Sequence, residues 1–213
     1  MDLNAWTTLL EGAWMTLWIS GISIALGIVA GFGVAVLRNA EIPIISRALY
    51  YYISIIRATP MITLVLFLFV TAPYLPIEID RWIIAVVALT INTTAFNAEI
   101  WRTALVTFSR EQVEAAKAAG MTRMLMMKRI MLPQMVITSM PGLVNEMTLL
   151  IKSSPAIAMV GLADLTRATN RISAVTYEPL PPILAAAVLY ILMIGALVRL
   201  QRIADKYARR LAM

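Results

Sequence analysis

The stretch Glu111-Gln-Val-Glu-Ala-Ala-Lys-Ala-Ala-Gly120 is the longest strongly polar interruption in a chain that is otherwise mostly apolar. Its content of Glu, Gln, Ala and Lys favours a short helix, and Gly120 is suited to end that helix in a left-handed turn. A basic segment follows and leads through Ile130, Leu132 and Pro133 into the next apolar stretch. A polar helix between two membrane-crossing segments must lie in water, where a soluble partner can contact it.

The composition places this helix in a membrane protein. Of the 213 residues, 61% are hydrophobic and only 14% are charged, which lies outside the range of ordinary soluble domains. Apolar stretches of about 17 to 25 residues are long enough to cross a hydrocarbon core of about 30 Å. We therefore predict an all-α, polytopic fold in which residues 1–213 form one transmembrane domain, with a cytoplasmic loop at about 103–130.

Five membrane spans are predicted, at about 14–37, 60–70, 82–101, 131–165 and 182–198. Ser23, Gly27 and Gly31 recur every four residues in the first span, which predicts close packing on another helix. Residues 38–57 are expected to form a basic, aromatic connection. The fourth span is expected to break at Pro141-Gly142 and again at Ser153-Ser154-Pro155, because proline removes a backbone donor.

The distribution of Lys and Arg orients these spans. Fourteen lie in the connection after the first span, in the 102–129 loop and in the tail, which ends in Arg209 and Arg210, against three on the opposite side. Basic residues are enriched in cytoplasmic loops. The C-terminus and the Glu111–Gly120 segment are therefore predicted to be cytoplasmic and the N-terminus external.

Several classes of chemistry are excluded by residues that the chain lacks. It contains no Cys and no His, which excludes disulfides, thiol nucleophiles, His-based acid–base catalysis and most zinc sites. No close cluster of acidic residues suggests another metal site. No Gly-x-x-x-x-Gly-Lys-Ser/Thr motif is present to bind ATP phosphates. We expect no cofactor in this chain, and the net charge of +6 reflects basic loops rather than nucleic-acid binding.

The spacing of Glu114-Ala-Ala116, Gly120 and Ile130-x-Leu132-Pro133 resembles the signature cytoplasmic loop of ATP-binding-cassette (ABC) importer permeases. Three more segments resemble motifs of the polar-amino-acid branch of that family: Arg57–Pro60, Thr94–Arg102 and Leu132–Gln134 with Pro141 and Lys152–Ser154. Together the motifs cover most of the chain. It departs from the family pattern at Ala58, Glu111, Ala119 and Ser153.

The resemblance implies the type I importer permease fold in a bacterial inner membrane, without an enzymatic activity of its own. It implies a second permease subunit, which is this chain or a relative, two ATPase subunits that bind ATP and Mg, and an extracytoplasmic substrate-binding protein. It also implies that the cytoplasmic loop docks onto an ATPase subunit. The residues assigned to this coupling are Glu111, Gln112, Glu114, Ala115, Ala116, Ala119 and Gly120.

A carboxylate inside a span identifies the candidate substrate site. A charge at mid-span costs about 2.5–3.5 kcal/mol, so Glu146 is predicted to meet a cationic group of the substrate. Ser153 lies seven residues on and shares its helix face. Polar residues of other spans complete the candidate site: Thr63, Thr90, Asn92, Thr94 and Asn97. A structural ion pair for Glu146, or interhelical hydrogen bonds for the others, remain the alternatives.

The predicted function is transport of polar amino acids, including cationic ones, into the cell by alternating access driven by a separate ATPase. An importer of opines or other amino-acid derivatives is the alternative within this class. A passive channel or a membrane scaffold is the alternative from another class.

Overall fold

The computed structural model describes residues 2–40 and 42–211, with the side chains of 208–211 excluded, so Arg209 and Arg210 of the predicted basic tail lie outside the described side chains. No strand occurs in the described residues, in agreement with the predicted all-α fold. The elements in chain order are α1 (Leu3–Arg38), α2 (Pro43–Ala58), α3 (Met61–Thr71), the 3-10 turn η1 (Ala72–Tyr74), α4 (Arg81–Val106), α5 (Arg110–Ala118), α6 (Arg123–Met126), the π turn η2 (Met127–Met131), α7 (Leu132–Ser153), the 3-10 segment η3 (Ser154–Val160), α8 (Leu165–Thr176) and α9 (Leu180–Leu211).

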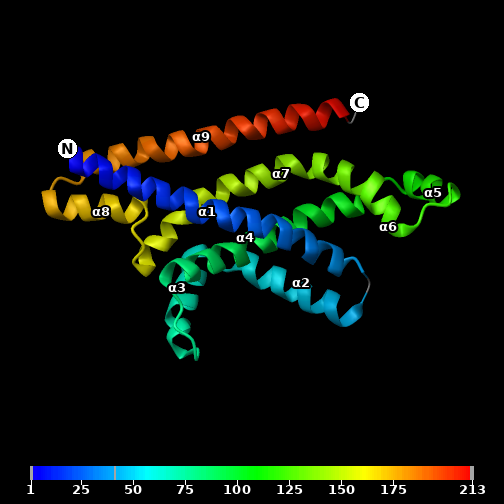
Figure 1. Cartoon of the computed structure of the whole chain (residues 1–213), viewed down its shortest axis with the longest axis horizontal. Coiled ribbons are helices and arrows are strands. Elements are labelled where there is room, and N and C mark those ends of the chain that lie inside the picture. Colours follow the sequence, from blue (N-terminus) through cyan, green and yellow to red (C-terminus); the bar gives the residue numbers. More distant parts are fainter. Residues whose placement is uncertain (1, 41, 212–213) are drawn as a thin grey trace.

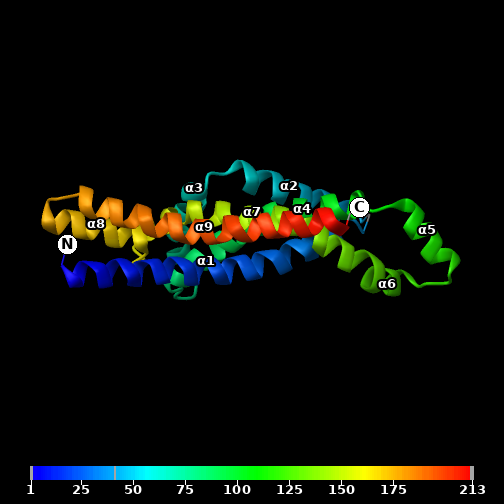
Figure 2. The same cartoon turned by 90° about the horizontal axis from the view of Figure 1, so that it is seen from above.

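Four helices, α1, α4, α7 and α9, run along the long axis of an elongated bundle (Figure 1). The start of α1 and the helix α8 lie at one end of the bundle, whereas α5, α6 and the end of α9 lie at the other, as Figure 2 shows from above. The core is correspondingly a row of small clusters, centred on Leu165, on Leu89 and on Trp101. This arrangement separates the α8 end from the α5 end.

Within the described part of the chain, three helices, α1, α4 and α9, are long and apolar enough to cross a membrane, or up to five segments if each of two bent helix pairs is one span. One pair is α2 with α3 and η1, bent by 109°, so α3 lies across the bundle. The other pair, residues 123–160 with α8, is bent by 53°. The count of five spans is thus compatible with the fold, and the orientation of the termini stays a prediction.

The predicted small-residue face of α1 packs directly on α4. Ser23, Gly27 and Gly31 are all buried. A Cβ added to Gly27 would lie 2.1 Å from the Thr93 Cγ2 atom, and one added to Gly31 would lie 2.7 Å from the Asn97 Cβ atom. The Ser23 hydroxyl also donates a hydrogen bond to the Val86 carbonyl oxygen at 3.3 Å. The backbones of α1 and α4 can approach this closely only because Gly27 and Gly31 lack side chains.

Of the two breaks predicted in the fourth span, one is wrong and one is confirmed. The break predicted at Pro141-Gly142 is wrong, because α7 continues through Pro141 to Ser153. Proline removes only one helical hydrogen bond, and a helix buried among others tolerates it. Gly142 lies against Ile100 of α4, with the position of a Cβ only 3.1 Å from the Ile100 Cγ2 atom, so packing supports the helix at this point. The break predicted at Ser153 is confirmed by η3, which ends at Gly161 with φ +88°.

The segment 38–57, expected as a connection, is mostly helical, because the 16-residue helix α2 runs from Pro43 to Ala58. Proline at the start of α2 occupies a position where its missing N–H costs nothing, and the following residues have no helix breaker until Pro60. The basic and aromatic residues that suggested a loop are therefore carried on a helix that packs against α4.

A π-helical turn joins α6 to α7. The N–H of Leu132 donates to the Met127 carbonyl oxygen, five residues back. Pro133, the next residue, has no N–H to donate, so the regular α-helical bonding pattern has one donor fewer where α7 begins. Such turns often occur at functional sites, and this one lies between the polar α5 segment and the long helix that carries Glu146.

Candidate transport site and coupling loop

The predicted polar helix is present as α5, which begins at Arg110 and ends at Ala118. The Ser109 hydroxyl caps its N-terminus by accepting a hydrogen bond from the Gln112 N–H at 3.4 Å. Gly120 has φ +74°, so it forms the predicted left-handed turn, and no atom lies within 4 Å of the position that a Cβ would take there. The turn requires glycine for its backbone conformation alone.

The seven predicted coupling residues comprise one buried residue and six exposed ones. Ala116 is buried, with 4% of its surface exposed, and packs on its own chain. The other six are exposed: Glu111, Gln112, Glu114, Ala115, Ala119 and Gly120. Gln134 of α7 donates from Nε2 to the Gln112 Oε1 atom at 3.0 Å, which ties α5 to the first turn of α7. These six exposed residues are therefore the ones that a partner can reach.

A cavity of about 360 Å³ separates α5 from the body of the protein. Its lining includes Val113 and Lys117 of α5 and several methionines, namely Met121, Met126, Met127 and Met131. Methionine side chains are flexible and adapt to changes in packing. The contact between α5 and the start of α7 can therefore change its geometry without opening a tightly packed core.

Glu146 is the centre of the candidate transport site. It lies on α7 and is 5% exposed. The Thr93 hydroxyl of α4 lies beside its carboxylate, and Arg57 supplies the charge that acts on it. The Arg57 guanidinium carbon is 5.2 Å from the centre of the Phe96 ring. The buried carboxylate thus lies within electrostatic range of a cation of the same chain, the exposed Arg57 near the end of α2, without a direct ion pair between them.

Arg57 is therefore on helix α2, which packs against α4, and not in a loop as the sequence suggested. Its removal from the cytoplasmic count leaves the imbalance of basic residues in the same direction. The prediction for the termini is unchanged.

The polar residues predicted on α4 face different neighbours. Asn97, 1% exposed, donates from Nδ2 to the Thr93 Oγ1 atom at 3.2 Å and so continues the polar contact away from Glu146. Thr94 is buried beside the hydroxyl of Tyr52, which donates to the Ile91 carbonyl oxygen at 2.8 Å. Thr90 is half-buried and its hydroxyl has no hydrogen-bond partner among the described residues.

The remaining predicted site residues are less clearly connected to Glu146. Asn92 is buried on α4, and Ser153 is half-buried at the last position of α7. Thr63 is exposed on α3. The structure thus brings Glu146 together with the Thr93–Asn97 pair, and does not place Thr63 in this buried group.

Two residues of the candidate site were missed by the sequence argument. Thr93 precedes Asn97 by four residues, so helical spacing places both on one face, but the choice of Thr90, Thr94 and Asn97 passed over it. Arg57 was noted only as the first residue of the Arg57–Pro60 motif. Its position within the bundle depends on helix α2, which the sequence argument did not foresee.

An ion-pair cluster lies at the α5 end of the bundle. Glu99 of α4 accepts from Arg102 Nε at 2.8 Å, as the spacing predicted, and it also pairs with Arg38 of α1. The Arg38 guanidinium lies over the Tyr50 ring of α2, 5.4 Å from its centre. This cluster joins α1, α2 and α4 where the polypeptide leaves the bundle for α5.

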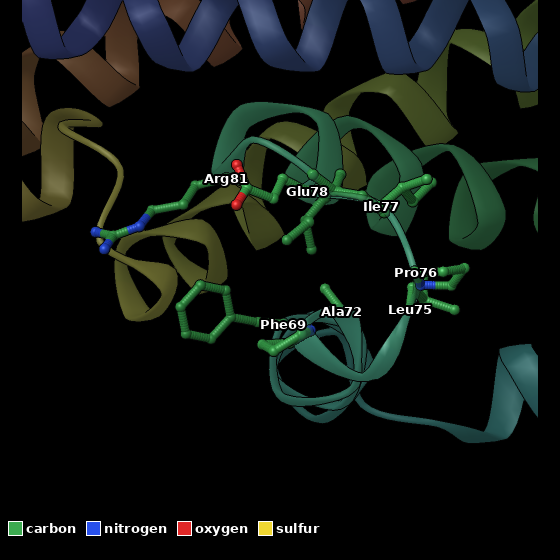
Figure 3. A pocket seen from close by; sticks show the side chains of 10 residues that line it. Phe69, Ala72, Leu75, Pro76, Ile77, Glu78 and Arg81 are labelled. Atoms are coloured by element: carbon green, nitrogen blue, oxygen red, sulfur yellow. The ribbon is translucent and has the colours of Figure 1, made fainter.

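A cavity of about 570 Å³ lies between the end of α3 and the start of α4 (Figure 3). Phe69, Ala72 and Leu75 form one side, and Ile77 and Glu78 lie across from them. Arg81 extends out of this cavity, away from Glu78, and its Nη1 atom lies 2.7 Å from the position of a Cβ on Gly161.

Comparison with known proteins adds three findings. Residues 23–210 match the family model described as "binding-protein-dependent transport system inner membrane component". The arginine transport system permease protein of Bacillus subtilis is 31% identical, over 87% of this chain and 85% of the relative. The nopaline transport system permease protein of Agrobacterium fabrum is 29% identical, over 95% of this chain and 88% of the relative.

A similar fold occurs in the crystal structure of an amino acid ABC transporter with histidines. Its matched chain is 28% identical to this one, and the superposition covers 99% of both chains with a TM-score of 0.85.

Proposed function

Because the chain belongs to the family of binding-protein-dependent transport system inner membrane components, we propose that it is the permease subunit of an ATP-driven importer of amino acids in a bacterial inner membrane. The family membership, with a match over residues 23–210, replaces the alternative of a passive channel or scaffold. Within the proposal, the chain supplies the path and part of the substrate site. A separate ATPase supplies ATP, Mg and the hydrolysis.

The observation that carries the substrate class is the opposite charge on Glu146 and Arg57. An amino acid carries an ammonium group and a carboxylate, and a site with one anion and one cation can bind both. The ion pairs of the described residues all involve Glu99, so Arg57 and Glu146 do not neutralise each other through direct contact. Glu146 would take the ammonium or a guanidinium of the substrate, and Arg57 its carboxylate.

The preference for cationic amino acids belongs to the same proposal. Glu146 is buried, and a buried carboxylate is stabilised most by a cation that it can contact directly. The relative named for arginine transport supports such a substrate. The nopaline relative supports opines as the second candidate class.

The proposed coupling begins at α5. ATP binding closes the ATPase pair, and the exposed face of α5 follows the movement. Because α5 is bonded to the first turn of α7 through Gln112 and Gln134, this movement reaches the helix that carries Glu146. The pocket would then open alternately to the two sides of the membrane.

A second permease subunit completes the proposed complex. Lys152 lies near the end of α7 and its side chain is exposed. A cation that faced lipid there would cost about 2.5–3.5 kcal/mol at mid-span depth. Contact with a second copy of this chain, or with a related subunit, would shield it.

Uptake into proteoliposomes tests the proposal. The permease is reconstituted with its ATPase and binding protein, and uptake of labelled arginine is measured with and without ATP. A charged hydrogen bond contributes about 1.5–3 kcal/mol, so Glu146→Gln should lower uptake at low substrate concentration by about 10- to 100-fold. The control, Glu178→Gln, removes an exposed carboxylate beyond α8 and should leave uptake unchanged.

Two results would count against the proposal in different ways. Uptake that does not require ATP would contradict the importer. ATP-driven uptake that is equal in Glu146→Gln and the wild type, with the ATPase still bound to both, would contradict only the contact between Glu146 and the substrate.

A further inference from the structure

Three arginines gather around one turn at the α8 end of the bundle. The turn comprises Ala158 to Gly161, where η3 ends. Arg167 of α8 donates from Nη1 to the Ala158 carbonyl oxygen at 3.1 Å, and Arg81 of α4 approaches Gly161. Arg171 lies one turn further along α8. A cavity of about 480 Å³, here called the arginine pocket, is lined by Ala158, Met159, Arg167, Asn170 and Arg171.

The positive charge of this region is not neutralised by neighbouring side chains. Arg81, Arg167 and Arg171 are exposed, and the ion pairs between described side chains are confined to Glu99 and its two partners. Asp164 is close in sequence, but it is fully buried and caps α8 by accepting from the N–H groups of Thr166 and Arg167. The pocket is thus available to an external anion.

The location of the arginine pocket indicates which kind of partner could reach it. It lies at the opposite end of the bundle from α5 (Figure 1), which is the external end if the charge distribution orients the protein as predicted. These three arginines are the ones assigned to that side. Insertion favours basic residues on the cytoplasmic side, so membrane topology gives no reason for three cations around one external turn.

We propose that the arginine pocket receives an acidic side chain of the extracytoplasmic binding protein when that protein docks. The inference rests on the proposed function, because an importer of this family depends on such a protein. The planar guanidinium groups of Arg167 and Arg171 can bind a carboxylate in bidentate geometry. Met159, 56% exposed, adds an apolar edge, and arginine and methionine are both enriched in the cores of protein interfaces.

Docking at this pocket is linked to the candidate transport site. The Arg167 guanidinium that would bind the incoming carboxylate also holds the Ala158 carbonyl of η3. η3 continues directly from α7, which carries Glu146. A carboxylate that attracts the Arg167 guanidinium would therefore alter its hydrogen bond to the Ala158 carbonyl, in the turn that follows this helix.

The test compares variants of the complete transporter in nanodiscs. The probe is the binding protein that supports ATP-dependent uptake by the wild type, and its Kd is measured by biolayer interferometry. Arg167→Gln and Arg171→Gln should each weaken binding at least 10-fold, whereas Arg171→Lys, which retains the charge without the planar fork, should give an intermediate value. ATPase activity of the Arg171→Gln transporter without binding protein should be unchanged, whereas Arg167→Gln also removes the hydrogen bond to the Ala158 carbonyl oxygen.

Val175→Glu is the matched control. Val175 is 74% exposed on the next turn of α8 and does not line the arginine pocket. The substitution changes the net charge by the same amount as an Arg→Gln variant. It should weaken docking by less than 3-fold, because it alters only the long-range electrostatic attraction.

Three outcomes overturn the inference. If both glutamine variants bind the binding protein with wild-type affinity, the arginine pocket does not take part in docking. The proposed function would still stand in that case, provided that the wild type shows ATP-driven uptake. A loss of binding that depends on the share of anionic phosphatidylglycerol in the nanodisc, and not on the binding protein, assigns the pocket to lipid. If basal ATPase activity is lost together with binding, the arginines are needed for folding and not for docking. Absence of ATP-driven uptake by the wild type instead contradicts the proposed function.

Discussion

At the scale of single residues, the close contact between α1 and α4 depends on two glycines, which carry a hydrogen atom where other residues carry a side chain. The glycine hydrogens of Gly27 and Gly31 face Thr93 and Asn97, and these two polar residues are bonded to each other and extend to Glu146. A change in the α1–α4 distance would therefore disturb both the packing and the polar group at the candidate transport site.

Gly27→Ala is predicted to destabilise the protein. The added methyl group would lie 2.1 Å from Thr93 Cγ2, and such overpacking costs about 1–3 kcal/mol. The midpoint of thermal unfolding of the purified protein should fall by about 2–12 °C, since about 1 kcal/mol shifts a domain of this size by about 2–4 °C.

Gly33→Ala in the same helix is the control, because nothing lies within 4 Å of its Cβ position. Alanine favours a helix over glycine by about 1 kcal/mol, so this midpoint should stay or rise. Equal effects of the two substitutions would contradict a close contact at Gly27.

Local spacing predicted the residue contacts that lie within one helix, and missed those between helices. The Glu99–Arg102 pair follows from their separation of three residues. Arg38, the second partner of Glu99, is 61 residues away in sequence, so only the fold reveals it. The same limit explains why Glu146 was predicted as an unpartnered carboxylate although Arg57 acts on it.

At the scale of elements, α5 combines a helix with a turn that only glycine forms easily. The predicted helix, its end and its exposure follow from local sequence, because capping and helix propensity act over a few residues. The same is true of the break at Ser153. The helical continuity through Pro141 could not be predicted in this way, since it depends on the packing of Gly142 against Ile100 of another helix.

Substitutions of Gly120 should rank by their tolerance of positive φ. Asparagine adopts the left-handed region more readily than other residues with side chains, and Gly120 has no neighbour within 4 Å of a Cβ position. Gly120→Asn should therefore retain most of the association with the ATPase, whereas Gly120→Val should lose much of it, measured by co-purification.

The comparison isolates the backbone effect from steric contact with the protein's own residues. If Gly120→Val co-purified with the ATPase as fully as the wild type, the turn would not be required for the proposed docking.

At the scale of the whole molecule, the sequence predicted the all-α membrane fold from composition and span length. The bend of 109° between α2 and α3 could not be read from these properties, because it depends on how α3 packs against η3 and α4 around Val65 and Ala88. The placement of α8 and α5 at opposite ends is a result of the complete fold.

Single cysteines test the predicted orientation, since the chain contains none of its own. Val175→Cys on α8 and Ala118→Cys on α5 both replace exposed residues. A membrane-impermeant maleimide added to intact spheroplasts should label Val175→Cys and not Ala118→Cys, with the mass of the purified protein as the measurement.

Permeabilised cells provide the control, because both cysteines should then react. Labelling of Ala118→Cys alone in intact spheroplasts would reverse the predicted orientation and would also place the arginine pocket on the cytoplasmic side.

The close contact of α1 with α4 has a mechanical consequence. The glycine face and the Arg38–Glu99 pair join the two helices at several levels, so they act as one stiff rod. α4 has 26 residues and is therefore about 39 Å long. α5 begins only four positions after the end of α4. If the proposed coupling tilts this helix pair by about 10° about its α5 end, the far end would move by about 7 Å over this length, so a small rotation at one end would become a large displacement at the opposite face.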